Sequence, residues 1–482
     1  MSRINNNVAS LVAQRHLSVS QRALTGSLER LASGLKINRG ADNPAGLIVS
    51  ERLRAEVAAV NQAIRNTARA SNVIATTEGA LNEVAALLTD IQALLVEAAN
   101  SGAFSDEEVA ANQLQIDSSI DSITRIANTT SFAGRKVING ELDYVTSGID
   151  STRLADVRLF GAEFGSQPFL GVNVRVLTSA QQAQLSFTGP GLTATPVTVD
   201  IAGPDGIVTL SFPASATTVQ MVSAINAQVD STGVRAVASG AGGVSGMRIY
   251  SDDYGTDAFV SVRPIVTGAF TVRNRSGVVV PRTTGRDASA TINGVQTTSH
   301  GLSLSVSNNS IAADVTLSTS FGGGSLGVGS STFAITSGGA LFQIGPQVNT
   351  NLQENIGIPS LHANKIGNAI VGYLADLKSG QSKSLASARF KEASEVVSAA
   401  ITQVAVVRGR LGAFEKDTLQ TNANQLQITA ENLLSSESVI RDTDFAEETS
   451  ELTRAQILVQ AGNSILAIAN AQSQNVLTLL GG

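Results

Sequence analysis

The chain has 482 residues, of which 43% are hydrophobic and only 15% charged, and it contains neither cysteine nor tryptophan. This length leaves room for several domains with separate cores. The lack of cysteine excludes disulfides, thiolate metal sites and cysteine nucleophiles, and a formal net charge of −6 gives no sign of a nucleic-acid or anionic-lipid partner.

The opening residues, MSRINNN, lack the apolar stretch and the small-residue cleavage site of a signal peptide. No stretch of the sequence is apolar enough to predict a membrane span. We therefore expect a protein that is cytoplasmic, or one that is exported by a route without a cleaved signal.

The N-terminal part predicts long helices. Leucines recur at helical spacing on one stripe before breaks at Ser33–Gly34 and at residues 39–43, namely Leu17, Leu24, Leu28, Leu31 and Leu35. Pro44 follows Asn43 as a first-turn proline follows a cap, and the pattern continues to about Asn100. At about 1.5 Å per residue, this second helix spans roughly 80 Å, which no small globular core requires.

A third helix and a hairpin complete the N-terminal part. Ser105 and Glu108 fit a capping box that opens a helix ending before Asn128. Residues 132–140 then predict a turn with a short hairpin.

The middle of the chain, residues 146–360, has the composition of strands and turns. It contains every proline except Pro44 and no lysine. Alternating apolar residues at 197–201 and 207–212 flank a Pro-Asp-Gly turn and predict a hairpin, and residues 217–230 predict a short helix. Two Ile-Asn pairs, at Ile225 and Ile292, suggest a weak internal similarity between two modules.

The C-terminal part again predicts helices. Apolar spacing begins the pattern at Ile366, Ile370, Tyr373 and Leu377, and joints are expected at residues 435–438 and 442–444. The last helix carries a seven-residue repeat, interrupted at Glu448, that is typical of coiled-coil pairing. Its large apolar members are Phe445, Leu452, Val459, Leu466, Val476 and Leu480, and its small residues Gly462, Ala469 and Ser473 would allow close approach of a neighbouring helix.

No catalytic constellation is present in the sequence. The three histidines lie in three separate segments, and a glycine pattern at residues 322–327 is followed by a strand-like run where a dinucleotide fingerprint requires a helix, so we interpret it as a loop. Residues 252–257 (DDYGTD) are compatible with a calcium site but equally with a polar turn. We expect no enzyme activity, no cofactor and no metal.

Several sequence runs at the two ends carry a family resemblance. They include residues 4–8 (INNNV), 28–38 (LERLASGLKIN), 41–47 (ADNPAGL), 410–413 (RLGA), 440–448 (IRDTDFAEE) and 474–477 (QNVL). As a set these runs resemble bacterial flagellin, the subunit of the motility filament. The Ile-Asn pairs of the insert resemble, more weakly, a module of some flagellins and hook-associated proteins.

The resemblance implies an α+β multidomain fold in which the terminal helices pack as an antiparallel bundle or coiled coil around a β-rich insert. Residues 1–43 and 445–482 would form an inner-tube domain, residues 44–145 and 361–444 a helical rod, and residues 146–360 the outer variable domains. We expect the two ends to be disordered in the monomer and to fold on assembly, because a lone helix cannot bury its apolar stripe.

The implied function is polymerisation into the extracellular flagellar filament. The expected interface is the apolar set of the two terminal helices named above, from Leu17 to Leu35 and from Phe445 to Leu480. Implied partners are further copies of the chain, an export chaperone on the C-terminal helix, the flagellar secretion system, the filament cap and the hook–filament junction proteins, with no nucleic acid and no membrane. The alternatives are a junction protein or surface adhesin of similar architecture, and a secreted hydrolase carried on flagellin ends.

One stretch departs from the family pattern. In flagellins that the vertebrate innate receptor recognises, this part of the long helix carries two arginines and a glutamate, whereas residues 88–97 of this chain place Asp90, Gln92 and Ala93 there. Exchange of Arg for Asp reverses the charge and removes a bidentate donor. We therefore expect weakened receptor contact in the region of Leu88 to Leu94, unless these positions are simply solvated or contact other subunits.

Overall fold

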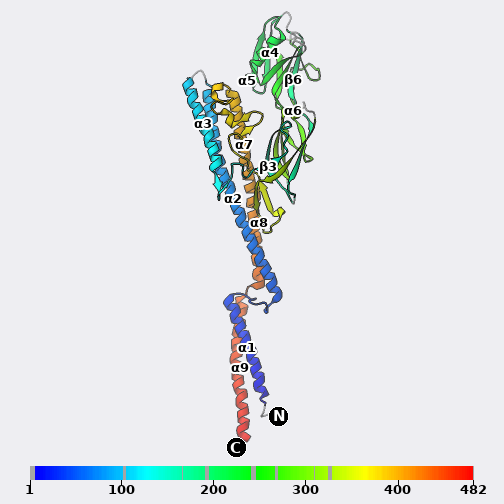
Figure 1. The fold of residues 1–482 in the computed structure, drawn as a ribbon. Coiled ribbons are helices and arrows are strands. Elements are labelled where there is room, and N and C mark those ends of the chain that lie inside the picture. Colours follow the sequence, from blue (N-terminus) through cyan, green and yellow to red (C-terminus); the bar gives the residue numbers. More distant parts are fainter. Residues whose placement is uncertain are drawn as a thin grey trace. The chain divides into compact units, whose positions relative to one another are not determined.

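The computed structural model describes residues 6–100, 105–165, 167–189, 191, 195–239, 246–265, 270–308, 310–323 and 328–480, without the side chains of residues 473–480 (Figure 1). Long helices form both ends of the chain and strands fill its middle, which confirms the predicted α+β class. The chain divides into two compact units. The first holds residues 1–68, 344–348 and 420–482, and the second holds residues 69–343 and 349–419.

The terminal helices α1 (Val8–Ser33) and α9 (Phe445–Leu480) pack against each other in the first unit (Figure 1). Asn7, the cap of α1, donates a hydrogen bond to the carbonyl of Ala469, and Arg30 near its other end contacts Glu448, so the two helices run antiparallel. Gly34 ends α1 in the left-handed conformation that glycine favours.

The first unit also contains the start of α2 (Pro44–Ala98) and α8 (Thr421–Arg441). Asn43 caps α2 by accepting a hydrogen bond from the amide of Gly46, as the sequence predicted. Val60 and Ala63 of α2 form a core with Leu426 and Ala430 of α8.

The joint expected at residues 435–438 is wrong. Helix α8 continues through this stretch to Arg441. The Ser436 hydroxyl donates to the Asn432 carbonyl within the helix, so the serine side chain does not compete with the backbone for a turn. Only the joint at residues 442–444 exists. There Thr443 donates its amide to Gly34 and Lys36 donates its amide to Arg441, so the two connecting segments lie side by side.

The second unit contains the rest of α2 together with α3 (Asp106–Thr129) and α7 (Phe390–Ala413). The capping box of Ser105 and Glu108 opens α3 as predicted. Hydrogen bonds tie these helices to their neighbours: Gln92 of α2 donates to Ser394 of α7, and Gln113 of α3 accepts from the amide of Leu385. A two-stranded hairpin of β1 (Ser131–Phe132) and β2 (Arg135–Lys136) follows α3 as expected.

The apolar character of these helices requires one correction to the sequence analysis. We expected no stretch apolar enough to span a membrane, but the helical stretches Pro44–Ala98 and Phe390–Arg441 are long and apolar enough to do so by length and composition alone. Helices in the core of a water-soluble protein have the same length and composition. Here the apolar positions include the fully buried Leu81, Leu88, Ile91 and Val396.

The helix predicted to begin at Ile366 is wrong. Residues 364–389 instead form a hairpin of β22 (Gly367–Asn368) and β23 (Gly372–Tyr373), followed by the 3-10 helices η3 (Leu374–Leu377) and η4 (Leu385–Ser387). Both hairpin glycines have positive φ, which a helix does not allow. The apolar spacing was real, because Ile366, Leu374 and Leu377 are buried, but it belongs to turns rather than to a helix.

Two β-sandwich modules make up the middle of the chain. The first module has one five-stranded sheet, ordered β15-β14-β5-β19-β3, and one four-stranded sheet, ordered β16-β17-β18-β4, around a common apolar core. Its strands are β3 (Tyr144–Ser147), β4 (Leu154–Ala162), β5 (Leu170–Thr178), β14 (Ser289–Ile292), β15 (Val295–Gln296), β16 (Thr298–His300), β17 (Ser303–Ser307), β18 (Ile311–Leu317) and β19 (Gly329–Gly338), with the short helix α6 (Thr319–Gly322).

The second module, residues 181–286, has two four-stranded sheets, ordered β12-β6-β10-β9 and β13-β11-β7-β8, around its own core. Its elements are β6 (Gln182–Thr188), β7 (Val197–Gly203), β8 (Gly206–Phe212), α4 (Thr218–Asn226), α5 (Val229–Thr232), β9 (Val234–Ser239), β10 (Gly246–Tyr254), β11 (Phe259–Pro264), β12 (Val272–Asn274) and β13 (Arg282–Thr284). The predicted hairpin is β7–β8, and the predicted helix is divided into α4 and α5. A last hairpin, β20 (Ala340–Gln343) with β21 (Gln353–Ile356) and the turn η2 (Thr350–Leu352), follows the first module.

The two Ile-Asn pairs lie in different structural settings. Asn226 ends α4 and exchanges two hydrogen bonds with the backbone of Ala236. Asn293 lies in the β14–β15 turn and bonds to the backbone of Asn173 and Gly171. Each asparagine side chain connects its own element to a neighbouring strand by hydrogen bonds. One asparagine ends a helix and the other lies in a hairpin turn, so the two pairs do not mark a structural repeat.

Candidate assembly surface on the terminal helices

The predicted apolar stripe forms the seam between α1 and α9. Three leucines of α1 and three apolar residues of α9 are half-buried there: Leu17, Leu24, Leu31, Leu452, Val459 and Leu466. Gly462 permits the close approach expected of it, since a Cβ at this position would lie 3.2 Å from Leu17 Cδ1. Ala455 and Ala469 are buried at the same seam. Most of the predicted stripe therefore pairs within the chain.

Polar contacts fix the register of this pair. Arg30 donates from Nε and Nη2 to the two carboxylate oxygens of Glu448, both at 2.9 Å. At the other end the Ser10 hydroxyl lies 2.8 Å from Asn470 Oδ1. The hydrogen bonds from Arg30 are the largest of the effects that hold the pKa of Glu448 below its usual range.

The remaining predicted interface residues lie elsewhere. Leu28 and Phe445 are exposed, at 49% and 59%, so neither is used in the seam. Leu35 is half-buried in the connection after α1, where it pairs with Asp442. The side chains of Val476 and Leu480 lie outside the described residues.

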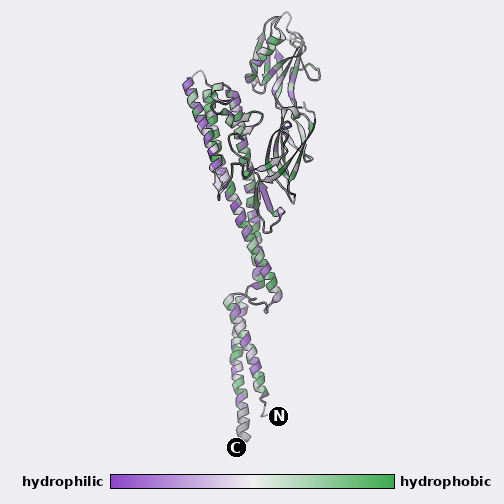
Figure 2. Cartoon of the chain, in the orientation of Figure 1, coloured by the Kyte–Doolittle hydropathy of each residue, from purple (hydrophilic) through white to green (hydrophobic). Residues whose placement is uncertain are grey.

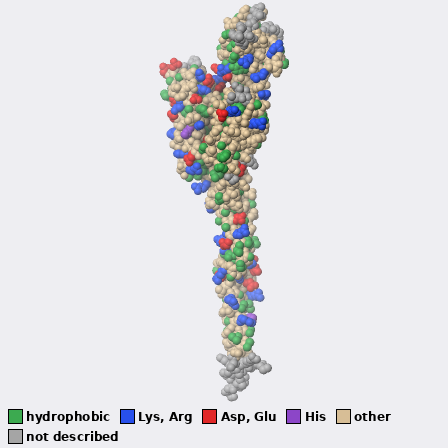
Figure 3. Space-filling model, turned by 45° about the vertical axis from the view of Figure 1, so that its right-hand side comes forward, with side chains coloured by type: hydrophobic (Ala, Val, Ile, Leu, Met, Phe, Trp, Pro, Cys, Tyr) green, Lys and Arg blue, Asp and Glu red, His purple; other side chains and the backbone are tan. Residues whose placement is uncertain are grey.

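A second apolar set on the same two helices was missed by the one-stripe interpretation. Its members are exposed on the outside of the pair: Val8, Leu11, Val12, Val19, Ile457, Leu458, Ile465 and Ile468. Figure 2 shows apolar residues, green, along both helices, and Figure 3 shows green side chains on the surface of this pair. Exposed apolar residues in such number mark an interaction site rather than a solvated face.

Part of this set lines a groove of about 600 Å³. The lining residues, all from α1 and α9, are Val8, Ala9, Val12, Ala13, His16, Gly462 and Ile465. No charged residue occurs from Ala455 to the end of the sequence. This absence was the sequence signal that could have identified the second set, because a solvated helix surface normally carries charges.

The described residues offer no metal site. No group of three or more His, Cys, Asp or Glu side chains is placed to hold an ion within the part of the chain that the structure describes. In the stretch considered for calcium, Asp252 pairs with Arg235 and Asp257 with His300. The loop expected at residues 322–327 lies partly outside the described residues, and it is followed by a strand, β19, as predicted.

Three family models match this chain. The bacterial flagellin N-terminal helical region matches residues 4–143, the C-terminal helical region matches residues 394–480, and the flagellin hook IN motif matches residues 184–253. The flagellin of Salmonella muenchen is 30% identical over 533 residues, with 99% of each chain covered. The chain belongs to the flagellin family. The flagellin of Salmonella rubislaw is 29% identical, again with 99% of each chain covered.

Among solved structures, this flagellin is similar to the D1-D2-D3 domains of the flagellar cap protein from Escherichia coli. The two share 18% sequence identity, with a TM-score of 0.30, over 46% of this chain and 64% of that one.

Membership of the flagellin family indicates the assembly to which the helix pair and its groove belong. This flagellin is a structural subunit that polymerises into the bacterial flagellar filament, an extracellular organelle of motility, and its family is one of structural proteins rather than enzymes. The junction-protein and adhesin alternatives are not favoured. The hook IN motif coincides with the first Ile-Asn pair and with most of the second module.

The stretch that the sequence analysis considered for receptor contact, residues 88–94, lies on α2 in the second unit. Leu88 is fully buried, Leu94 is half-buried, and Gln92 is half-buried where it bonds to Ser394. Asp90 and Ala93 are exposed. Only these last two present their side chains freely to another molecule.

Proposed function

We propose that this flagellin assembles by burying the outer apolar face of its terminal helix pair against neighbouring subunits. Residues 1–43 and 445–482 would form the inner tube of the filament, residues 44–145 and 361–444 the surrounding helical layer, and residues 146–360 the outer domains. The contact is head-to-tail and does not close, so it generates a filament rather than a ring.

The observation that carries this proposal is the apolar groove on α1 and α9 with its exposed neighbours. Ile457, Ile465 and Ile468 are each more than half exposed in the single chain. Burial of one such side chain is worth about 1.5–3 kcal/mol. Several of them per subunit, repeated at every contact, offset the cost of ordering the helices on assembly.

The predicted stripe has a different part in this proposal. Leu17, Leu24, Leu31, Leu452, Val459 and Leu466 hold α1 to α9 and so build the surface that neighbours bind. Leu28 and Phe445, which are exposed, contact neighbours directly. Val476 and Leu480, whose side chains lie outside the described residues, stay in the proposed interface on the strength of the sequence repeat alone.

The same exposed apolar face requires protection before assembly. We propose that an export chaperone covers α9, because a helix with exposed Ile457, Leu458 and Ile465 fits an apolar groove in a partner. Export by the flagellar secretion system without a cleaved signal, and contacts with the filament cap and the hook–filament junction proteins, belong to the same proposal and rest on family membership.

An isoleucine-to-aspartate pair tests the assembly surface. Ile465→Asp places a charge in the groove and should abolish filament formation, as seen by electron microscopy of the purified chain. Ile207→Asp is the matched control, since Ile207 is also exposed (66%) but lies on β8 of the second module. Normal filaments from Ile465→Asp would contradict the proposal, as would an equal loss of filament formation in both variants.

Two further variants separate the seam from the outer face. Leu466→Asp should separate α1 from α9 and abolish assembly, whereas Leu28→Asp should abolish assembly without loss of the helix pair. In both cases the second unit should remain folded in circular dichroism and proteolysis.

We also propose that this flagellin activates the vertebrate innate flagellin receptor weakly. Asp90 is exposed and carries the wrong sign for a surface that pairs with an arginine. Asp90→Arg should therefore raise the response of receptor-reporter cells to the monomer, and Glu83→Arg on the same helix should not.

A further inference from the structure

Four arginines occupy the outer face of one sheet in the second module. We call this surface, on the sheet β12-β6-β10-β9, the arginine face: Arg235, Arg248, Arg273 and Arg275. Side chains alternate along these strands near the arginines, so that Leu185, Ile249 and Val272 are buried in the core while the arginine side chains are exposed on the opposite side. Figure 3 shows several blue side chains on this module, and none is a lysine, because residues 137–364 contain none.

The strand register places these cations in a row. Arg273 of β12 pairs with Ser186 of β6, and Ser186 pairs on its other side with Arg248 of β10. Neighbouring strands are about 4.8 Å apart, so the backbones of Arg273 and Arg248 are roughly 10 Å apart on one line across the sheet. Arg275 follows β12 and donates to Gln184 of β6 at 3.1 Å.

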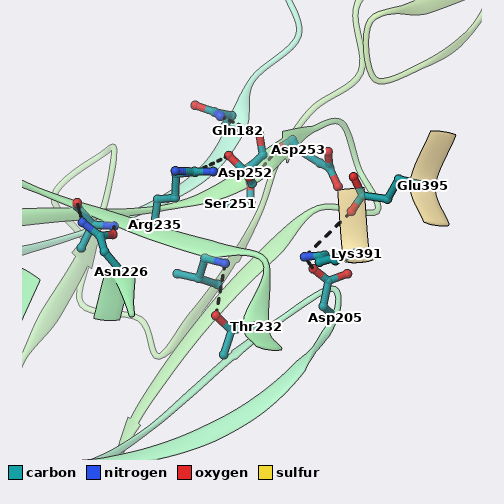
Figure 4. Close-up of polar contacts among 12 residues, drawn as sticks. Gln182, Asp205, Asn226, Thr232, Arg235, Ser251, Asp252, Asp253, Lys391 and Glu395 are labelled. Atoms are coloured by element: carbon teal, nitrogen blue, oxygen red, sulfur yellow. Dashed lines mark hydrogen bonds and ion pairs between the residues drawn. The ribbon is translucent and has the colours of Figure 1, made fainter. Parts of the chain in front are cut away.

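The positive charge of this face is mostly uncompensated. Asp252 lies on the same face and binds Arg235 through two hydrogen bonds of 2.7 and 3.1 Å (Figure 4). Arg273 and Arg275 donate to uncharged acceptors, the carbonyl of Gly277 and the amide oxygen of Gln184. Arg248 has no ion-pair partner among the described residues. Three cations thus gather on one flat surface of a chain whose net charge is −6.

We propose that the arginine face binds a linear anionic glycan that carries carboxylate or sulfate groups. A guanidinium group binds such planar or tetrahedral anions through two parallel hydrogen bonds, which a lysine cannot do. Between the arginines, Gln184 and Ser186 supply amide and hydroxyl groups suited to sugar hydroxyls. A chain of sugars with regularly spaced anions matches cations that lie in a row.

Two other polyanions fit the face less well. A lipid surface favours apolar or aromatic anchors beside the cations, and the exposed apolar residue here is Val237 alone among the described strand residues of this face. Nucleic acid binding draws its affinity from many phosphate contacts, and three arginines without an ion pair among the described residues provide few. Because the filament repeats the face once per subunit, weak single contacts add up to strong attachment along a polymer.

The experiment measures binding of monomeric full-length chain to immobilised heparin, a sulfated and carboxylated glycan, over a range of salt concentrations. The variant R248Q/R273Q/R275Q should lose at least tenfold in affinity, and the slope of log K against log salt should fall by about three. The control R175Q/R263Q/R282Q removes the same charge from exposed arginines on other sheet faces and should remain within about twofold of wild type.

Further variants and ligands test whether bidentate guanidinium binding and a glycan ligand are required. R248K/R273K/R275K keeps the charge but removes the bidentate geometry, and it should bind more weakly than wild type and more tightly than the glutamine variant. Equal loss in the glutamine variant and its control would overturn the proposal, as would tighter binding of wild type to duplex DNA or phosphatidylserine vesicles than to heparin. Because these measurements use monomer, they are independent of assembly, and the glutamine variant should still form filaments.

Discussion

Arg30 and Glu448 form a bidentate ion pair across the seam between α1 and α9, with two hydrogen bonds of 2.9 Å. The side chain of Glu448 is only 12% exposed. It occupies the place where the seven-residue repeat of α9 carries a charged residue. A polar residue in such a seam lowers stability but selects one register, because any slip leaves it without its partner.

Removal of this pair should weaken the terminal helix pair. Arg30→Met or Glu448→Gln should each cost about 1 kcal/mol, seen as a lower temperature of thermal depolymerisation of filaments. A double-mutant cycle should show coupling between the two positions. Arg454→Met is the control. Arg454 pairs with Glu451, and both side chains are exposed to solvent (71% and 55%), so this substitution should change the depolymerisation temperature little.

The same pair makes the helix pair sensitive to acid. The Arg30 hydrogen bond lowers the pKa of Glu448, against a smaller opposing effect of burial. A carboxyl group with a lowered folded-state pKa stabilises the fold above its unfolded pKa, and this stability is lost as the pH falls through the folded value. Filaments of Glu448→Gln should therefore lose less stability on acidification than wild type. An unchanged acid midpoint would contradict this assignment.

Glu395 should have the opposite effect on stability as the pH falls, because its pKa is raised rather than lowered. It lies with Asp205 and Asp253 around Lys391 in a cleft of about 780 Å³ (Figure 4). Lys391 Nζ is 2.7 Å from Asp205 and 4.0 Å from Glu395. Burial raises the pKa of Glu395, Lys391 lowers it, and the neighbouring carboxylates of Asp253 and Asp205 raise it further.

A carboxyl group with a raised folded-state pKa destabilises the fold above that value, and the fold gains stability as the pH falls towards the ordinary carboxyl range. Glu395→Gln should thus raise the unfolding temperature of the second unit at about pH 7.5 and reduce the gain seen at about pH 5. Calorimetry of the monomer measures both effects. Glu83→Gln on the exposed face of α2 serves as control, and a lower unfolding temperature in Glu395→Gln at neutral pH would refute the interpretation.

Tyr144 should be a structural anchor where β3 enters the first module. Its buried hydroxyl donates to the Asn355 carbonyl at 3.2 Å and accepts from the Ala162 amide at 2.9 Å. Tyr144→Phe leaves the Ala162 amide without its acceptor in a buried site, which costs about 1–3 kcal/mol. Thermal unfolding and amide exchange at Ala162 should both report the loss.

Tyr250→Phe provides the comparison for this experiment. Tyr250 is half-buried on β10, and its hydroxyl makes no such pair of bonds to the described residues, so its removal should leave the unfolding temperature nearly unchanged. Equal stability of both variants would show that the Tyr144 hydroxyl is not an anchor.

The apolar repeat of α9 and its antiparallel pairing with the N-terminal helix were both correctly predicted. The sequence spacing, however, assigned Leu452, Val459 and Leu466 to the contact between subunits. Half-burial of these residues against Leu17 and Leu24 assigns the stripe to the pair within the chain. Because α1 covers that side of α9, Ile457 and Ile465 remain exposed on the other side, and only the structure reveals this.

The error at residues 364–389 has a similar cause. Apolar residues at spacings of three and four predict a helix when they are considered alone. Gly367 and Gly372 adopt positive φ, and Gln403 of α7 accepts a hydrogen bond from the amide of Gly367. A distant helix therefore helps to select the hairpin, which a local pattern cannot reveal.

The sequence by itself determined the helical ends, the strand-rich middle, the caps at Asn43 and Ser105 and the family. These depend on local periodicity, turn residues and short motifs. Tertiary structure alone decided which face of α1 and α9 remains open, why Glu448 interrupts the repeat, and that arginines from β9, β10 and β12 share one surface. These depend on the register between segments far apart in the chain, and register is fixed by packing rather than by spacing within one segment.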